Sequence, residues 1–483
     1  MRRAFTSHLA LLLAVNLLVK PLYLFGVELG VQNVVGTEAY GRYATYFAFA
    51  LLFGVVYDLG LQNYNAVTLS RTPALLRERL PVLLALKLAV SGAYVLLVLA
   101  AAYLLGAELA EFRLAGLAAL YHAGLSLLNL LRTNLGAQER YAAGSLLSVV
   151  DRLALVIVVG GLLAFAPVLA RRVLTVEAFL LAQVGAVALG SVLVVAATRL
   201  EPGQRWLRWD RAELRGLVRA AVPYALVLAL TTAYTRVDVV MVEALHPAGA
   251  REAGVYAAAY RFLDAANMVT FLFASLLIPM LAHGLREGQP VAPLLRQAGG
   301  YVYAIAVGAA AYATAFAEPL VTALLVEADE AWGPPLRVLM WSSLGTGFTY
   351  VYGSYLLVRG ELRRLNVLFA AALVANVALN ALLIPGLGAV GAAAATTATQ
   401  LIVAGVEYAW SVARVREGAL SVRAMGGFTA GLLGGTYGLT LLGLGWATGL
   451  ITTAAIALGL AFGTGLWGDP RALVALLRSR GGA

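Results

Sequence analysis

Charged side chains inside long apolar segments are the residues of this sequence best placed to do chemistry. A charge at a lipid-facing position in the middle of a bilayer costs about 3 kcal/mol or more, so a deep one should face a packed interior or a wet cavity. Guanidinium and ammonium groups in such a cavity would bind an anionic phosphate, and arginine would do so through two parallel hydrogen bonds. The bases in such segments are Lys20, Lys87, Arg152, Arg236, Arg261 and Arg337, and the acids are Glu28, Asp58, Asp151, Asp238, Glu243, Asp264 and Glu407.

Depth within the apolar segment separates these residues into groups. Arg337, Glu243 and Glu407 stand near segment ends, where a side chain reaches the headgroups by itself. Asp151 and Arg152 stand about ten residues into their segment, roughly 15 Å deep at 1.5 Å per residue. Adjacent residues on a helix diverge by about 100°, so we expect each of these two to have other partners and one of them to face a cavity.

The charges between residues 236 and 264 leave two interpretations open. Asp238 and Arg261 lie about equally far from a turn near residues 249 and 250, so an antiparallel hairpin would place them at one depth. Arg261 and Asp264 are also spaced i, i+3, which fits an intrahelical ion pair that rigidifies the bundle. In the alternative, Arg236 or Arg261 contacts a substrate phosphate. The predicted substrate-binding residues are Lys20, Lys87, Arg152, Arg236 and Arg261, and the predicted coupling or charge-pairing residues are Glu28, Asp58, Asp151, Asp238 and Asp264.

The composition excludes several other kinds of chemistry. Of the 483 residues, 61% are hydrophobic and 12% are charged, against about a quarter charged in a soluble domain, so the chain is no water-soluble globular protein. Cysteine is absent, the four histidines match no zinc spacing, and neither lysine belongs to a phosphate-binding loop. We therefore predict no metal and no cofactor. The net charge of +10 comes from scattered residues, which cannot form a continuous groove for nucleic acid.

Apolar stretches long enough to cross a bilayer recur along the whole chain. A helical span needs about 20 residues to cross a hydrocarbon core of roughly 30 Å, which leaves room for about fourteen spans. Arginines alternate between the connections, with 24 on one side and 5 on the other, and this bias predicts that both termini are cytoplasmic. We thus predict an all-α polytopic membrane protein. The spans lie near residues 8–35, 40–68, 80–106, 112–136, 141–167, 173–199, 217–245, 253–282, 297–325, 332–358, 362–386, 388–413, 424–444 and 447–467.

The predicted spans form two bundles of six helices and an additional pair. The bundles cover residues 1–200 and 217–415, and the extra helix pair with a short basic cytoplasmic tail covers residues 416–483. Weak internal similarity supports a duplication, because Gly41-Arg-Tyr-Ala opens the second span and Gly254-Val-Tyr-Ala opens the eighth, 213 residues later. A unit with an even number of spans repeats in the same orientation, so the two bundles should be parallel repeats.

A cytoplasmic amphipathic linker, residues 201–216, is predicted to separate the two bundles. Asp210 and Glu213 in this basic stretch resemble a capping box. Arginines here would contact lipid headgroups, while the apolar side chains would face the lipid interior. These apolar side chains are Trp206, Trp209, Leu214 and Leu217. The tail from Asp469-Pro470 onward repeats this pattern in miniature.

Several short motifs of the chain are shared with a known family. They are Asn16 to Pro21, Val31 to Gly36, Glu38 to Tyr43, Asp58 to Asn63, Arg236 to Asp238, Gly254 to Arg261, Asn376, Asn380, Ile384 to Gly386 and Gly388 to Ala393. Together they resemble the bacterial oligosaccharide flippases, of the O-antigen or capsule type, in the multidrug/oligosaccharidyl-lipid/polysaccharide exporter superfamily. The resemblance covers essentially the whole chain and is diagnostic of the superfamily rather than of the cargo. A departure from many relatives is the near absence of lysine, so phosphate recognition would fall mostly to arginine.

The resemblance implies a secondary transporter rather than an enzyme. Two six-helix bundles around a central cavity would move a lipid-linked, pyrophosphate-bearing oligosaccharide from the inner to the outer leaflet by alternating access. The implied partners are this lipid and the membrane lipids, with H⁺ or Na⁺ left open as a coupling ion, and the chain is expected to act as a monomer. Alternatives are a multidrug or organic-cation exporter, a flippase of the peptidoglycan precursor and, more distantly, a membrane glycosyltransferase or polysaccharide polymerase. The last would need a sizeable outer loop, and the longest predicted outer loops have only about ten residues.

Overall fold

The computed structural model describes residues 15, 18–59, 61, 76–137, 141–198 and 207–467. Helices dominate these residues, and no strand occurs among them, which confirms the predicted all-α class. The chain divides into two compact units, Met1–Gly254 and Val255–Ala483. The bundle boundaries predicted from the sequence stay a prediction, and the units are described one at a time below.

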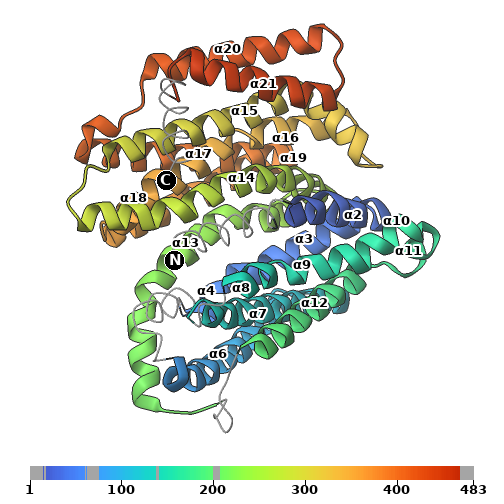
Figure 1. Cartoon of the computed structure of the whole chain (residues 1–483). Helices are drawn as coiled ribbons and strands as arrows, with labels where there is room; N and C mark the ends of the chain where they lie inside the picture. The colour runs from blue at the N-terminus through green and yellow to red at the C-terminus, as the bar shows by residue number, and fades with distance from the viewer. Residues whose placement is uncertain are drawn as a thin grey trace. The chain divides into compact units, whose positions relative to one another are not determined.

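The first unit is a helical bundle centred on one long helix, α7. This helix packs against α3, α6 and α12, and these neighbours share a core of leucine and valine side chains that includes Leu128, Leu131 and Val187 (Figure 1). The elements are η1 (Leu22–Glu28), α2 (Leu29–Val35), α3 (Thr37–Leu52), α4 (Gly54–Asp58), α6 (Leu76–Leu104), α7 (Leu109–Ala137), α8 (Tyr141–Leu147), α9 (Val150–Leu155), η3 (Val156–Gly160), α10 (Gly161–Phe165), α11 (Pro167–Val173), α12 (Val176–Ala197) and α13 (Arg211–Leu245).

Two of the elements in this unit, η1 and η3, are π-helical and pack against each other. Short π-helical stretches inside α-helices are uncommon and occur often at functional sites. Lys20 directly precedes the proline that caps η1, and α9, which carries Asp151 and Arg152, runs directly into η3. The predicted charges of the first and fifth spans therefore meet where two irregular helices touch.

The second unit is built around α15, α17 and α19. Helices α20 and α21 pair with each other and with α15, so the predicted extra pair lies against the bundle of this unit (Figure 1). Helix α14 begins in the first unit and continues in the second. The elements are α14 (Gly249–Arg286), α15 (Ala292–Leu324), η4 (Glu330–Trp332), α16 (Gly333–Leu339), α17 (Ser342–Phe348), η5 (Thr349–Gly353), α18 (Ser354–Val358), α19 (Leu362–Arg414), η6 (Arg416–Gly418), α20 (Val422–Leu441) and α21 (Trp446–Gly463).

Helix α19 is a hairpin of two arms that meet at Gly388. This glycine has φ 52° and ψ −129°, a backbone conformation that side chains with a Cβ rarely adopt. The arms then pack so closely that a Cβ at Gly391 would lie 2.6 Å from the carbonyl oxygen of Leu383. The predicted spans 362–386 and 388–413 correspond to these two arms.

The apolar helices make the chain a multi-pass membrane protein. Among the described residues, seven helices are long and apolar enough to cross a membrane, or eight if the bent pair Val150–Phe165 and Pro167–Val173 counts as one span. The pair bends by 115° at Ala166, and Pro167 starts the short α11 that follows. Each predicted span contains a helical segment in the described residues, but the number of fourteen crossings stays a prediction.

The predicted linker, residues 201–216, overlaps the first turns of a longer helix in the described residues. Asp210 does cap a helix, because its Oδ1 accepts hydrogen bonds from the backbone N–H groups of Ala212 and Glu213. The helix it caps is α13, which continues without a break to Leu245. Leu214 and Leu217 are buried against α6 instead of facing lipid, since the first turns of α13 pack on that helix, whereas Trp209 is 61% exposed. Trp206 and the tail from Asp469 lie outside the described residues.

The two glycines that open the repeated motifs contact each other's helices. A Cβ on Gly41 of α3 would lie 1.7 Å from the carbonyl oxygen of Ala250, and a Cβ on Gly254 would lie 2.2 Å from that of Thr37. Thr37 and Ala250 are themselves separated by the repeat offset of 213 residues. The contact is thus reciprocal, as a pseudo-twofold axis between the first turns of α3 and α14 requires.

Candidate functional site

Three basic side chains gather around one buried acid in the first unit. Asp151 is nearly inaccessible, with 3% of its side chain exposed. Its Oδ1 accepts a hydrogen bond from Nη2 of Arg132 at 3.0 Å, and its Oδ2 accepts one from Nη1 of Arg152 at 3.4 Å. Lys20 is close enough that the charges of all three residues act on its ammonium group. We call these four residues the cationic cluster.

The positions of the cluster residues follow from their helices. Arg132 lies in the last turns of α7, the central helix of the unit, and its Nη1 also bonds to Oδ1 of Asn129 one turn earlier. Asp151 and Arg152 open α9, which packs against α12 and η1. These contacts bring together residues from the first, fourth and fifth predicted spans.

The cluster has more positive than negative charge. Arg132 and Arg152 pair with the single carboxylate of Asp151, and Lys20 is within electrostatic reach of all three. Even with Glu28, whose charge also acts on Arg152, the bases of the cluster outnumber the acids by one. The side chain of Arg152 is 28% exposed and that of Arg132 is 15% exposed, so neither is sealed in the core. Such a partly open cationic site in a low-dielectric setting favours an anionic ligand with several acceptor oxygens.

Lys87 and Asp58 form a different, closed arrangement. Nζ of Lys87 donates to the carbonyl oxygen of Tyr57 at 2.7 Å, to Oδ1 of Asp58 at 3.3 Å and to Oγ of Ser126. Ser126 in turn donates to the same Asp58 oxygen at 3.2 Å. An ammonium group has three donors, and all three of this one are used in a fully buried environment. This geometry favours a structural role for the pair over the predicted contact with substrate.

The other predicted residues lie on α13 and α14. Asp238 and Arg261 are buried, with 0% and 4% of their surface exposed, while Arg236 and Asp264 are half-buried. Arg236 is close enough to His122 of α7 for its charge to act on the imidazole. Asp238 belongs to the first unit and Arg261 to the second, so their predicted equal depth stays a prediction.

Arg132 is the cluster residue that sequence reasoning missed. The predicted fourth span, residues 112–136, includes it, yet the alternation of basic loops placed it among the cytoplasmic connections. The available signal was its position four residues inside that span, with Asn129 at i−3 on the same helical face.

Comparison with known proteins identifies the family. The model of one protein family, described as polysaccharide biosynthesis protein, matches residues 8–284, which is more than half of the chain. The chain belongs to this family. The matched region contains the whole cationic cluster, and it confirms the family resemblance indicated by the sequence motifs. No curated protein sequence matches the chain.

Solved structures with the same fold are transporters. A structure described as the lipid II flippase MurJ in an inward closed conformation is 11% identical, covers 96% of this chain and 100% of its own, and has a TM-score of 0.71. An inward-facing multidrug resistance MATE family transporter is 15% identical, with coverage of 82% and 94% and a TM-score of 0.63. A transporter from Pyrococcus furiosus, described as having a binding pocket of reverse polarity, is 16% identical, with coverage of 85% and 95% and a TM-score of 0.59. The chain therefore has the fold of the MOP superfamily, to which the last two are assigned.

Proposed function

We propose that this member of the polysaccharide biosynthesis family is a flippase. Its cargo is a lipid-linked oligosaccharide with a pyrophosphate group, moved from the inner to the outer leaflet of the plasma membrane by alternating access of two helical bundles. The observation that carries the proposal is the cationic cluster, whose partly exposed arginines supply the donors that a pyrophosphate needs. Arg236 and Arg261 are further proposed contacts of the phosphate, and Asp238 and Asp264 adjust their charge.

The rest of the proposal concerns sidedness, coupling and assembly. Both termini face the cytoplasm, because most of the arginines of the connections lie on that side. The protein works as a monomer, without a chemical step of its own. Glu28 and Asp151 adjust the charge of the cluster, and either is suited to carry a coupling proton or to contact Na⁺, since both lie beside cluster arginines.

A multidrug or organic-cation exporter is the second candidate, since a MATE family transporter is among the structures of the same fold. A cation would need a site with an excess of acids. The sign of the cationic cluster is the opposite, because among the described residues three bases there outnumber two acids. This observation favours the anionic cargo.

A reconstituted transport assay with two cargoes tests the proposal. Vesicles that contain the purified chain are given a fluorescent lipid-pyrophosphate oligosaccharide or a cationic dye, and the fraction that crosses is measured by a membrane-impermeant quencher. We expect the oligosaccharide lipid to cross and the dye to stay. In cells that lack their own flippase, Arg152→Ala and Arg261→Ala should abolish complementation while insertion stays normal. Dye transport without oligosaccharide translocation would overturn the assignment in favour of the exporter.

A further inference from the structure

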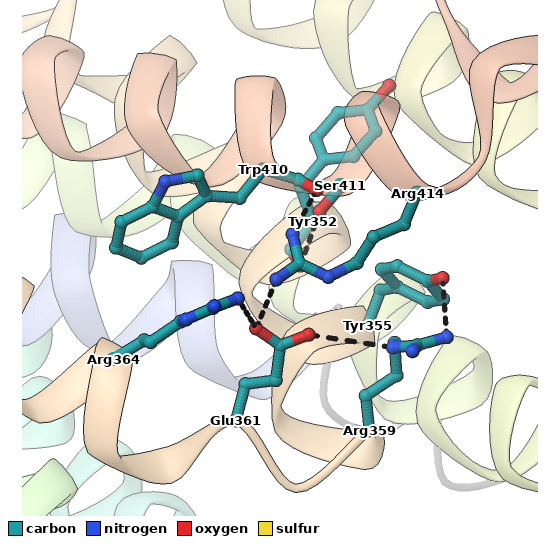
Figure 2. A network of polar contacts seen from close by, with 8 residues as sticks. All are labelled: Tyr352, Tyr355, Arg359, Glu361, Arg364, Trp410, Ser411 and Arg414. Carbon is teal, nitrogen blue, oxygen red and sulfur yellow. Dashed lines mark hydrogen bonds and ion pairs between the residues drawn. The ribbon is translucent and has the colours of Figure 1, made fainter.

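A second basic site lies in the second unit, where the two ends of α19 meet. A cavity of about 600 Å³ is lined there by Arg363, Arg364, Val367, Trp410 and Arg414. The ends are together because the hairpin at Gly388 returns the chain to its starting level. Figure 2 shows the guanidinium groups of Arg364 and Arg414 both directed at Glu361, the residue that precedes α19.

Glu361 holds these arginines in place without neutralising them. Its Oε2 accepts from Nη2 of Arg414 at 2.6 Å and from Nη1 of Arg364 at 2.9 Å, and its Oε1 lies 3.5 Å from Nε of Arg359. Arg363 adds a fourth guanidinium, for which the described part of the chain shows no ion pair. Three arginines therefore share the Glu361 carboxylate, and with Arg363 the local excess is three positive charges.

The position of the arginines on α19 makes this excess unfavourable without a ligand. Arg363 and Arg364 lie in the first turn of the helix, where the helix dipole already contributes positive charge. The side chain of Arg364 is 61% exposed, so donors remain available on the cavity side. An anion in the cavity would relieve the repulsion.

The apolar part of the cavity points to a lipid as the source of that anion. Val367 is 64% exposed, and Val374, two turns further along the same arm, is 71% exposed. An apolar strip therefore leads from the arginines along the helix, and Trp410 lies at its polar end, as tryptophans do at membrane interfaces. A free phosphate would use the arginines and leave the strip uncovered, whereas a phospholipid would use both.

We propose that this cavity binds the phosphate headgroup of an anionic glycerophospholipid from the surrounding leaflet. The phosphate contacts Arg363, Arg364 and Arg414, the glycerol region lies against Trp410, and an acyl chain follows Val367 and Val374. By the distribution of arginines this is the cytoplasmic leaflet. The site is separate from the cationic cluster and does not depend on what the protein transports.

Binding to the purified full-length chain tests the proposal. Native mass spectrometry and the thermal unfolding midpoint are measured with phosphatidylglycerol, with phosphatidylcholine and with inorganic phosphate. We expect phosphatidylglycerol to remain bound and to raise the midpoint, and the other two to do neither. Arg363→Gln should weaken phosphatidylglycerol binding about five-fold, as expected for one arginine near an anionic lipid. Because Arg363 has no ion pair in the described part of the chain and only adds to the positive charge, this variant should unfold no earlier than the wild type without lipid.

Arg423→Gln is the matched control, since Arg423 is another exposed arginine in the first turn of a helix of the same unit. It should bind phosphatidylglycerol like the wild type. Equal loss in both variants would show general surface attraction and overturn the proposal, as would equal binding of phosphatidylcholine or protection by inorganic phosphate alone. A last outcome would also overturn the proposal: a polyprenyl pyrophosphate displaces phosphatidylglycerol from the wild type but not from Arg363→Gln. The cavity would then be a loading site for cargo.

Discussion

Individual basic side chains inside the first unit differ in how many of their donors are already used, and this difference predicts two different roles. Arg132 and Arg152 share Asp151 and remain partly exposed, while Lys87 has spent all three donors on buried acceptors. Under the proposed function, a basic side chain in an apolar setting can thus bind cargo or, as with Lys87, hold helices together. Substitutions at the two places should separate the roles.

Removing an arginine from the cationic cluster should lower transport more than stability. A hydrogen bond from a charged group contributes about 1.5–3 kcal/mol, so Arg132→Gln or Arg152→Gln should reduce the rate of oligosaccharide translocation about 10- to 100-fold. Arg337→Gln is the control, because it breaks an ion pair of similar length, 2.9 Å to Glu318, outside the cluster. Translocation in reconstituted vesicles is the measurement. A similar loss in all three variants would contradict the role of the cluster.

Removing Lys87 should do the opposite. Lys87→Met leaves the buried Asp58 carboxylate without its cation, which costs about 3–5 kcal/mol of folding stability. The double variant Lys87→Met/Asp58→Leu removes both charges and should recover most of that loss. The unfolding midpoint of the purified protein in detergent measures both effects. A single variant with normal stability and no transport would instead indicate that Lys87 contacts the cargo.

The sequence located part of this site and missed part for identifiable reasons. The depth of Asp151 and Arg152 in their apolar segment was sufficient to single them out. Arg132 was hidden because a basic residue near a span end resembles a sidedness signal. The closure of Lys87 onto Asp58 depends on α4 packing against α6, a tertiary contact that no spacing along the chain reveals.

At the scale of elements, spans were predictable and the breaks inside them were not. The predicted spans at 80–106, 173–199 and 424–444 correspond closely to α6, α12 and α20. The predicted span 141–167 contains α8, α9, η3 and α10 instead of one helix. The apolar composition of this span is uniform, so its hydropathy does not indicate where the helix changes from α to π. That change occurs where η3 packs against η1.

The hairpin in α19 depends on one glycine, and a pair of variants can show this. Gly388→Ala places a side chain at φ 52°, ψ −129° and should destabilise the protein by about 1–3 kcal/mol. Gly386→Ala, two residues earlier, meets no atom within 4 Å and should be neutral or stabilise by up to about 1 kcal/mol, because alanine favours helix more than glycine does. Thermal unfolding compares the two. Equal midpoints would contradict the requirement for glycine at the turn.

The reciprocal glycine contact should keep the first turns of α3 and α14 together. Gly41→Ala would put a Cβ 1.7 Å from the carbonyl oxygen of Ala250, so the helices must separate. The chain has no cysteine, and Ala253→Cys introduces a single thiol at a position that is 0% exposed. We expect a maleimide to label this thiol much faster in the Gly41→Ala background. Gly92→Ala, which meets no atom within 4 Å, should leave labelling slow. Slow labelling of the introduced thiol in both the Gly41→Ala and the Gly92→Ala backgrounds would contradict the proposed role of the glycine contact.

At the scale of the whole molecule, duplication connects the sequence with the fold. Two motifs 213 residues apart were weak evidence by themselves, since short matches arise by chance in so biased a composition. Their glycines lie close to each other's helices through equivalent residues, Thr37 and Ala250, which supports the predicted duplication. Parallel repeats require an even number of spans in each half, so the sidedness of every connection is constrained once one is known.

This constraint makes the predicted topology testable with single cysteines in the cysteine-free chain. With both termini in the cytoplasm, cysteines in place of Glu108, Glu330 and Leu442 should react with a membrane-impermeant maleimide in intact cells. Those in place of Glu287 and Glu417 should react only after the membrane is made permeable. All five residues are exposed and lie in connections or at helix ends, so the substitutions should leave the bundles intact. One span more or fewer than predicted between two neighbouring positions would invert every later site, so the point at which the pattern inverts would locate a missed or spurious span. A complete inversion would instead keep the number of spans and overturn the assignment of the termini, because arginine bias sets orientation separately from the count.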